Sequence, residues 1–325
     1  MKFNAHGFRV LASAAMSTLA ASCCAADEKA PVKVLMIGNS FTASVMRETP
    51  NLAKAAGLKL DIVQCGIGGC PLDKHWRNVE KAGDKDFKPY SISASFASDP
   101  DRKFPKMANV TDMLSAEKWD VVTIQQASGK SPFYDTYQPY ADKLVAKIRE
   151  LAPQAKIVVQ ETWSYSPYDK RLAQWKMTPA EMYKALKKAY AQLAEKHGLR
   201  TIPTGDAVQL FRERLPVDYG TLLTKAEIEA LKQPATIDFH GDVVGASFWG
   251  KGRKGKQKDA DEVKLRCDFP HLNARGHYLQ ACVWAGFLFD VDPTTFTYRP
   301  ESLPEADAKL MRECARDALK ATGGY

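Results

Sequence analysis

Hydrophobic and polar positions alternate along the chain in blocks that predict strands and helices in turn. Val32 to Ile37 is a continuous apolar run, as expected for a strand buried on both faces of a parallel sheet. Further short apolar runs predict the other strands, at 58–65, 120–126, 156–162 and 199–203. Helices are predicted between them, at 44–56, 137–151 and 179–197. This order is typical of an α/β protein with a central parallel sheet of about five strands.

The helix over 179–197 has the clearest boundaries. Thr178 is a suitable N-cap, and Glu181 three residues later completes a capping box. Pro179 fits the first helical position, and Gly198 fits the left-handed residue that ends many helices. His197 then lies at the helix end, where a cation is favoured by the macrodipole.

Two segments, 84–112 and 211–265, show no clear period and are rich in Gly, Pro and charged residues. We expect them to be loop insertions at the functional edge of the sheet. The remaining pattern predicts one domain over 27–325, with its core at about 32–290 and a C-terminal helical tail at 300–325.

The first 26 residues have the pattern of a signal peptide. Lys2 and Arg9 are their only charges, the stretch 10–21 is apolar or small, and small residues follow up to Ala26. Lipid attachment at Cys23 or Cys24 is the alternative. No later stretch is long and apolar enough to span a membrane, so we expect an exported protein, periplasmic or extracellular.

The net charge of +8 is mildly basic and spread along the chain, and no nucleic-acid-binding module is recognisable. One dense basic stretch, Lys251 to Lys258, is either a solvated loop or a contact for an anionic polysaccharide or membrane surface.

Five cysteines follow the predicted signal peptide, at 65, 70, 267, 282 and 314. Their odd number and spacing exclude a disulfide scaffold and a zinc site. Pairing among Cys65, Cys70 and Cys267, including a Cys70–Cys267 bridge, is left open.

Asp268-Phe-Pro-His271 near the end of the chain offers a carboxylate three residues before an imidazole. Such a pair can orient a histidine that acts as general base for a weak nucleophile. Pro270 suits the first turn of a helix, so we expect the last helix of the core to begin near His271.

The nucleophile for that base is expected at the carboxyl end of the first strand, where open parallel sheets bind ligands. Ser40 follows Gly38-Asn39 there and is either exposed as a nucleophile or a plain N-cap. Gly68 and Gly69 follow the second strand, and glycines let backbone N–H groups turn toward a negative charge. Gln125 and Gln126 end the third strand and are costly to bury without partners.

These blocks, in this order, resemble the SGNH (GDSL-type) hydrolase superfamily. Gly38-Asn39-Ser40 is similar to its Gly-Asp-Ser block, with Asn39 in place of Asp. Gly69, with Gly68 as second choice, matches its oxyanion glycine, and Asp268 to His271 matches its last block. The third block departs, because Gln125-Gln126 stands where the family has Gly-x-Asn-Asp.

The resemblance implies a three-layer α/β/α, flavodoxin-like fold and a Ser40–His271–Asp268 triad. It also implies an oxyanion hole made by Ser40, Gly69 and an amide that we assign to Gln126. No metal or organic cofactor is required by that chemistry.

Substrate contacts are expected from aromatic and polar side chains near the predicted edge. They are His75, Trp76, Gln125, Trp163 and Tyr165, with Tyr168, Trp175 and Trp249 as further candidates. Core packing is the alternative for each aromatic side chain, since large side chains are normally buried.

The sequence thus predicts a serine esterase acting on an O-acetyl or related ester of a carbohydrate or similar small molecule outside the cytoplasm. An acyltransferase or a lipase-type esterase would use the same triad. A non-catalytic carbohydrate-binding protein on this scaffold is the remaining alternative, and nothing in the sequence predicts the oligomeric state.

Overall fold

The structure is a computed structural model that describes residues 1, 30–215, 219–252 and 261–323. The predicted signal peptide and the basic stretch from residue 253 on lie outside the described residues. Residues from Pro31 onward form one compact unit, which contains every element below.

Seven strands form one sheet in the order β4-β3-β2-β1-β5-β6-β7. Five of them are parallel, as the apolar runs predicted. These are β1 (Val32–Gly38), β2 (Leu60–Gly66), β5 (Val121–Ile124), β6 (Lys156–Gln160) and β7 (Arg200–Ile202). All their carboxyl ends therefore meet at one edge, with β1 between β2 and β5.

The segment 84–112 is not a loop insertion, contrary to the prediction. It contains β3 (Tyr90–Phe96), which pairs antiparallel with β2, and β4 (Met107–Ala108), which pairs with β3. Most side chains of β3 are exposed or half-buried, so its sequence lacks the continuous apolar run of a central strand.

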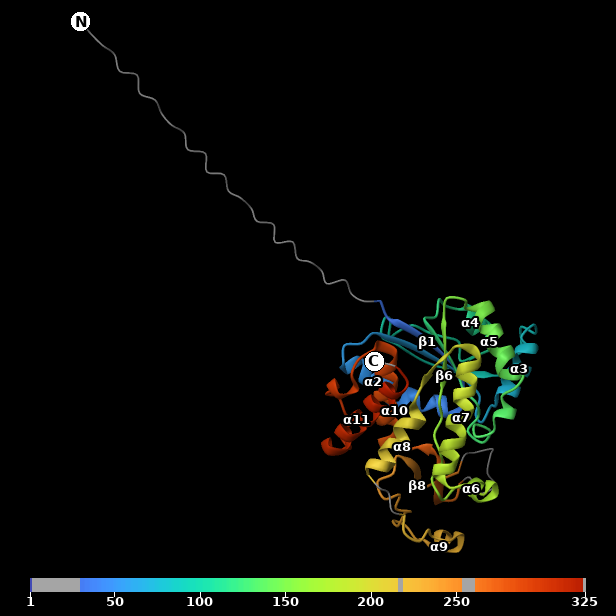
Figure 1. Cartoon of the computed structure of the whole chain (residues 1–325), viewed down its shortest axis with the longest axis vertical. Coiled ribbons are helices and arrows are strands. Elements are labelled where there is room, and N and C mark those ends of the chain that lie inside the picture. Colours follow the sequence, from blue (N-terminus) through green and yellow to red (C-terminus); the bar gives the residue numbers. More distant parts are fainter. Residues whose placement is uncertain (2–29, 216–218, 253–260, 324–325) are drawn as a thin grey trace. The chain divides into compact units, whose positions relative to one another are not determined.

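Helices cover both faces of the sheet, which gives the α/β/α layers (Figure 1). One layer contains α2 (Val45–Ala55), α8 (Thr204–Arg214), α10 (Ala274–Phe289) and α11 (Glu305–Ala321). The other contains α3 (Leu72–Glu80), α4 (Val110–Ser115), α5 (Tyr140–Leu151) and α7 (Pro179–His197). Among the described helices, none is long and apolar enough to span a membrane.

The boundaries of α7 agree with the prediction residue for residue. Thr178 and Glu181 form the capping box, and Gly198 ends the helix at φ +64°. His197 bonds Asp142 of α5 through Nε2 at 2.7 Å, so it ties two helices of one layer together.

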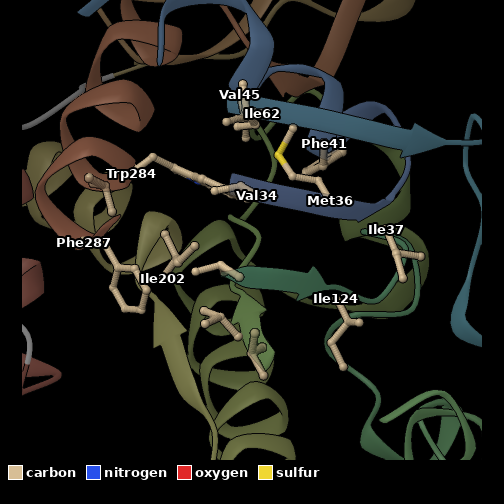
Figure 2. Close-up of a cluster of buried hydrophobic side chains, with 14 of the residues drawn as sticks. Val34, Met36, Ile37, Phe41, Val45, Ile62, Ile124, Ile202, Trp284 and Phe287 are labelled. Carbon is tan, nitrogen blue, oxygen red and sulfur yellow. The ribbon is translucent and has the colours of Figure 1, made fainter. Parts of the chain in front are cut away.

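The helix α10 is the centre of its layer. It is apolar on all sides, as expected of a helix buried all round, and α2, α8 and α11 pack against it. Figure 2 shows Trp284 and Phe287 of α10 with the buried side chains of β1. The predicted C-terminal tail is therefore part of the core, since α11 buries Met311 and Leu319 against its neighbours.

A two-stranded antiparallel hairpin carries the last sequence block. It consists of β8 (Val244–Gly250) and β9 (Lys264–Leu272). The predicted helix start at His271 was wrong, because Pro270 and His271 belong to β9 and α10 begins at Ala274 with Asn273 as N-cap.

Short elements complete the connections. They are α1 (Ser40–Ala43), η1 (Tyr134–Thr136), α6 (Lys170–Trp175), α9 (Lys225–Ala230) and η2 (Pro293–Thr295).

Candidate active site

Ser40, His271 and Asp268 form one continuous hydrogen-bonded chain. Ser40 Oγ lies 2.8 Å from His271 Nε2, and His271 Nδ1 lies 2.7 and 3.0 Å from the two carboxylate oxygens of Asp268. An ionised carboxylate only accepts hydrogen bonds, so this contact places the ring proton on Nδ1. Nε2 is then free to accept the serine proton.

The register between β8 and β9 shifts in the segment that carries His271. Val244 pairs with Leu272 but Ala246 pairs with Asp268, so β9 holds two residues more than β8 between these pairs. Bulges of this kind are frequent next to active sites because they redirect side chains. They also tolerate proline, which explains Pro270 inside a strand.

Asn273 and Gly276 hold the end of this hairpin to α10. The Asn273 amide donates to the carbonyls of Asp242 and Gly245, and its oxygen caps the helix by accepting from the Gly276 N–H. A Cβ at Gly276 would lie 2.3 Å from the Val243 carbonyl oxygen, so only glycine fits.

Trp163 joins the two halves of the site. Its ring stacks on Phe41, the residue after Ser40, with ring centroids 4.3 Å apart. Its indole N–H donates to the carbonyl of Pro270, the residue before His271, at 2.9 Å. One buried side chain therefore contacts the neighbours of both the serine and the histidine.

Ser40 begins α1, and Asn39 caps that helix by accepting from the Phe41 N–H. The glycine turn after β2 lies against it, because Ile67 N–H donates to the Gly38 carbonyl at 3.1 Å. Gly69 adopts φ +63°, a conformation that favours glycine. In the described part of the chain, the N–H groups of Ser40 and Gly69 have no acceptor, so both are available to an anion.

The two departures from the SGNH pattern contact each other. Asn39 Oδ1 accepts from the Gln125 amide at 2.6 Å, and Asn39 Nδ2 donates to the Cys70 carbonyl at 3.1 Å. The aspartate usual at this position could accept from Gln125 but, when ionised, could not donate to Cys70. Asn39 and Gln125 are both buried, so Gln125 positions the serine turn and is not exposed to a substrate, contrary to the prediction.

Gln126 does not provide the oxyanion amide that we predicted. Its Nε2 donates to the carbonyl and hydroxyl of Thr136, at 2.9 and 3.2 Å. Its Oε1 accepts from the backbone N–H groups of Leu72 and Ala127. Gln126 is fully buried and cross-links three loops.

The aromatic side chains predicted to bind substrate are mostly structural. Trp163 and Tyr165 are both 0% exposed, so neither offers a face to a sugar. His75 is buried on α3 and bonds the Tyr90 hydroxyl, at 2.9 Å. The Trp76 indole N–H donates to Glu80 of its own helix, and the Lys143 ammonium lies over its ring.

The three further aromatic candidates are half-buried. Trp175 packs against Tyr165, and the Trp249 indole N–H donates to the Ala235 carbonyl. Tyr168 stacks on Phe269, which follows Asp268, at 5.6 Å between ring centroids. Tyr168 is therefore, like the buried Trp163, in contact with the segment that carries the histidine.

Two titratable side chains near the site, His277 and Cys70, are kept uncharged by burial. It lowers the pKa of His277 to about 4, with the positive charge of Arg47 contributing, so His277 is neutral at pH 7. Burial also raises the pKa of Cys70 to about 12, which leaves its thiol protonated.

The cysteines at 65, 70, 267, 282 and 314 are free, so the Cys70–Cys267 bridge is not formed. Within the described residues, no three His, Cys, Asp or Glu side chains are grouped to hold a metal.

A buried ion pair between Arg212 and Asp242 supports the β8–β9 hairpin, and the sequence did not predict it. Arg212 of α8 bonds Asp242 through Nε and Nη2, and it also donates to Ser164 Oγ at 2.8 Å. The Asp242 side chain is completely buried. Its carbonyl accepts from Asn273, so the pair fixes the base of β8 and β9. The partners are 30 residues apart and no local motif marks them.

Comparisons with known proteins place the chain in a family. Residues 33–217 match the family described as a domain of unknown function, DUF4886. The chain belongs to this family. A crystal structure of a DUF4886 family protein from Bacteroides uniformis is 25% identical, covers 90% of this chain and 95% of its own, and has a TM-score of 0.68.

A proposed SGNH hydrolase from Slackia heliotrinireducens is 19% identical over 79% of this chain and 98% of its own, with a TM-score of 0.45. No curated protein matches the chain. The strand order and the position of the sequence blocks at the carboxyl ends of β1, β2 and β5 make the chain SGNH-like in fold, as its motifs implied.

Proposed function

We propose that the protein is a serine esterase of the SGNH type, with Ser40 as nucleophile, His271 as general base and Asp268 as its orienting carboxylate. The observation that carries the proposal is the chain of contacts from Ser40 Oγ through both ring nitrogens of His271 to Asp268. A serine that served only as a helix cap would not need this chain, and Asn39 already caps α1.

In the proposed reaction, Ser40 Oγ attacks the ester carbonyl carbon while His271 Nε2 takes its proton. The N–H groups of Ser40 and Gly69 stabilise the oxyanion. His271 then protonates the leaving alcohol, which departs and leaves an acyl-serine. A water molecule, deprotonated by His271, attacks the acyl-serine and releases the acid and the free serine.

We propose an O-acetyl or related ester on a carbohydrate as the substrate class. The side chains of His271 and Asp268 are 33% and 43% exposed, so the dyad is open to a bulky molecule. The predicted signal peptide supports a substrate outside the cytoplasm. Mass spectrometry of the mature N-terminus in the exported protein tests this. A start near Asp27 supports it, and a cytosolic protein that begins at Met1 contradicts it.

Hydrolysis of a soluble acetyl ester, with acetylated sugars as a second panel, tests the function. Ser40→Ala should lower kcat at least ~10³-fold, since loss of the nucleophile removes covalent catalysis. Ser93→Ala is the matched control, because Ser93 is exposed on β3. Equal activity in Ser40→Ala and wild type would refute the proposal.

A further inference from the structure

A cavity of about 660 Å³ lies beside the segment that carries the dyad. It lies between α6, α9 and β9 and is open to solvent. Its lining is mostly apolar and includes Tyr168, Ala173, Leu222, Leu223, Ile228 and Phe269. Its volume is within the range of small-molecule sites, ~300–1,000 Å³.

The strand β9 lines this cavity and also carries the proposed catalytic dyad, and a second wall is linked by contacts to the loop after β5. Cys267 and Phe269 line the cavity and are the two neighbours of Asp268 in β9. Arg171, at another wall, lies 4.1 Å over the Tyr165 ring, and the Tyr165 hydroxyl donates to Ser128 in the loop after β5. The strand β5 is the direct neighbour of β1, which leads to Ser40.

Other cavities are at the opposite edge of the sheet. One of about 480 Å³ is lined by Lys59 and Leu60 at the start of β2. Another, of about 540 Å³, is lined by Val121 and Lys156 at the starts of β5 and β6. Ligands of open parallel sheets bind at the carboxyl ends, so neither is placed to receive the substrate of Ser40.

The walls of the 660 Å³ cavity combine apolar side chains that the fold itself does not cover with five charged residues, which are Asp169, Lys170, Arg171, Lys225 and Glu229. No residue of α9 is buried, and Leu222, Leu223 and Ile228 are only half-buried. Covering such side chains is favourable in proportion to the apolar area removed from water.

We infer that this cavity binds an apolar group of the ester substrate, an alkyl or aryl chain that extends past β9 from the reacting ester. The inference rests on the proposed function and adds an apolar chain, on the acyl or the alcohol side, to its substrate class. Because consecutive residues of a strand face opposite sides, the cavity and the Asp268 carboxylate lie on two sides of β9. An acetyl ester carries no chain to place in the cavity, whereas an octanoyl ester does, so the chain length of the ester tests whether the cavity is used.

Rates on matched esters test the inference. Ala173→Trp places a large ring in the cavity, and Gln174→Trp adds the same ring at the next exposed position of α6, outside the lining. We expect Ala173→Trp to lower the ratio of kcat/KM for octanoyl over acetyl esters at least ~10-fold, which corresponds to about 1.4 kcal/mol. Gln174→Trp should keep the wild-type ratio. Octyl acetate in place of the octanoyl ester shows whether the alcohol or the acyl side carries the chain.

The inference is overturned if Ala173→Trp hydrolyses the acetyl ester and keeps the wild-type ratio of kcat/KM for both the octanoyl ester and octyl acetate. This result leaves the proposed function intact. A protein that hydrolyses no ester overturns the function instead.

A binding measurement keeps the inference testable without turnover. Cys267 lines the cavity and is exposed, while Cys65, Cys70, Cys282 and Cys314 are buried. In Ser40→Ala, an octanoyl ester should slow the modification of Cys267 by N-ethylmaleimide at least ~5-fold, as followed by peptide mass spectrometry. An acetyl ester at the same concentration should not. Equal modification rates with both esters count against the cavity as the site of the chain.

Discussion

Asn39→Asp tests how the nucleophile turn is held, because it restores the residue usual in SGNH proteins and changes one atom type. The Asn39 amide donates to the Cys70 carbonyl at 3.1 Å, and its oxygen accepts from Phe41 and Gln125. An ionised aspartate keeps both accepted bonds and loses the donated one. A carboxylate oxygen would then face a carbonyl oxygen in a buried place.

The size of the effect follows from these contacts. A buried polar group that loses its partner costs about 1–3 kcal/mol. The two N–H donors that remain stabilise the charge of the new carboxylate, which keeps the loss near ~2 kcal/mol at pH 7. For a domain that spans residues 31–325, with an unfolding entropy of ~2.1 cal/mol/K per residue, a loss of ~2 kcal/mol lowers Tm by roughly 3 °C.

The loss should depend on pH, because a protonated aspartate regains an O–H donor. The folded state of Asn39→Asp then binds its proton more tightly than the unfolded state, so the folded pKa of that carboxyl is raised above about 3.9. Stability relative to wild type is retained below pH ~4 and is lost as the pH rises through the folded pKa. At ~1.4 kcal/mol per pH unit, a loss of ~2 kcal/mol is complete near pH ~5.5.

Thermal unfolding of wild type, Asn39→Asp and Asn51→Asp at pH 4 and pH 7 measures this directly. Asn51 is exposed on α2, where its amide donates to Glu48 at 3.3 Å, so Asn51→Asp adds the same charge beside a carboxylate and should cost only the ~0.2–0.5 kcal/mol of an exposed like-charge pair. A Tm loss that is equal in both variants, or that does not shrink at pH 4, would refute the role given to the Asn39 amide.

Three other substitutions separate structural from catalytic roles. Gln126→Ala should lower the free energy of unfolding by ~1–3 kcal/mol, because the Leu72 N–H loses its acceptor. A kcat loss of ~10²-fold without that destabilisation would instead indicate that Gln126 is an oxyanion donor. Arg212→Met should lower the free energy of unfolding by ~3–5 kcal/mol, because it leaves the buried Asp242 carboxylate without its cation. Denaturant unfolding measures the loss, and a change below ~1 kcal/mol contradicts the role of this ion pair in fixing the base of β8 and β9. Trp163→Phe keeps an aromatic ring but loses the N–H donor to the Pro270 carbonyl in β9, so kcat should fall ~10-fold with KM unchanged. An unchanged kcat argues against the positioning role.

The sequence predicted those helices and strands whose signals lie within the element itself. The boundaries of α7 could be predicted because its capping box and its terminal glycine lie within the helix ends themselves. The five parallel strands were found because burial on both faces leaves a continuous apolar run. The antiparallel strand β3 and the hairpin strand β9 lack such a run, since most of their side chains are exposed or half-buried.

Long-range contacts decided what the sequence did not reveal. The types and order of Ser40, Asp268 and His271 were readable, because each lies in a short sequence block that can be recognised locally. Whether Trp163 faces solvent or stacks on Phe41 depends on residues far along the chain, and so does the choice of partners by Gln125 and Gln126. A polar or aromatic side chain in a loop therefore predicted a location near the site but not a role in it.

Covalent labelling by a fluorophosphonate, mapped by peptide mass spectrometry, tests the catalytic serine most directly. The proposal predicts one adduct, on Ser40, that is absent in Ser40→Ala, reduced at least ~10²-fold in rate in His271→Ala and unchanged in the exposed-site control Ser93→Ala. No adduct on the folded wild-type protein, or an adduct that persists in Ser40→Ala, would contradict the assignment of Ser40 as an activated nucleophile.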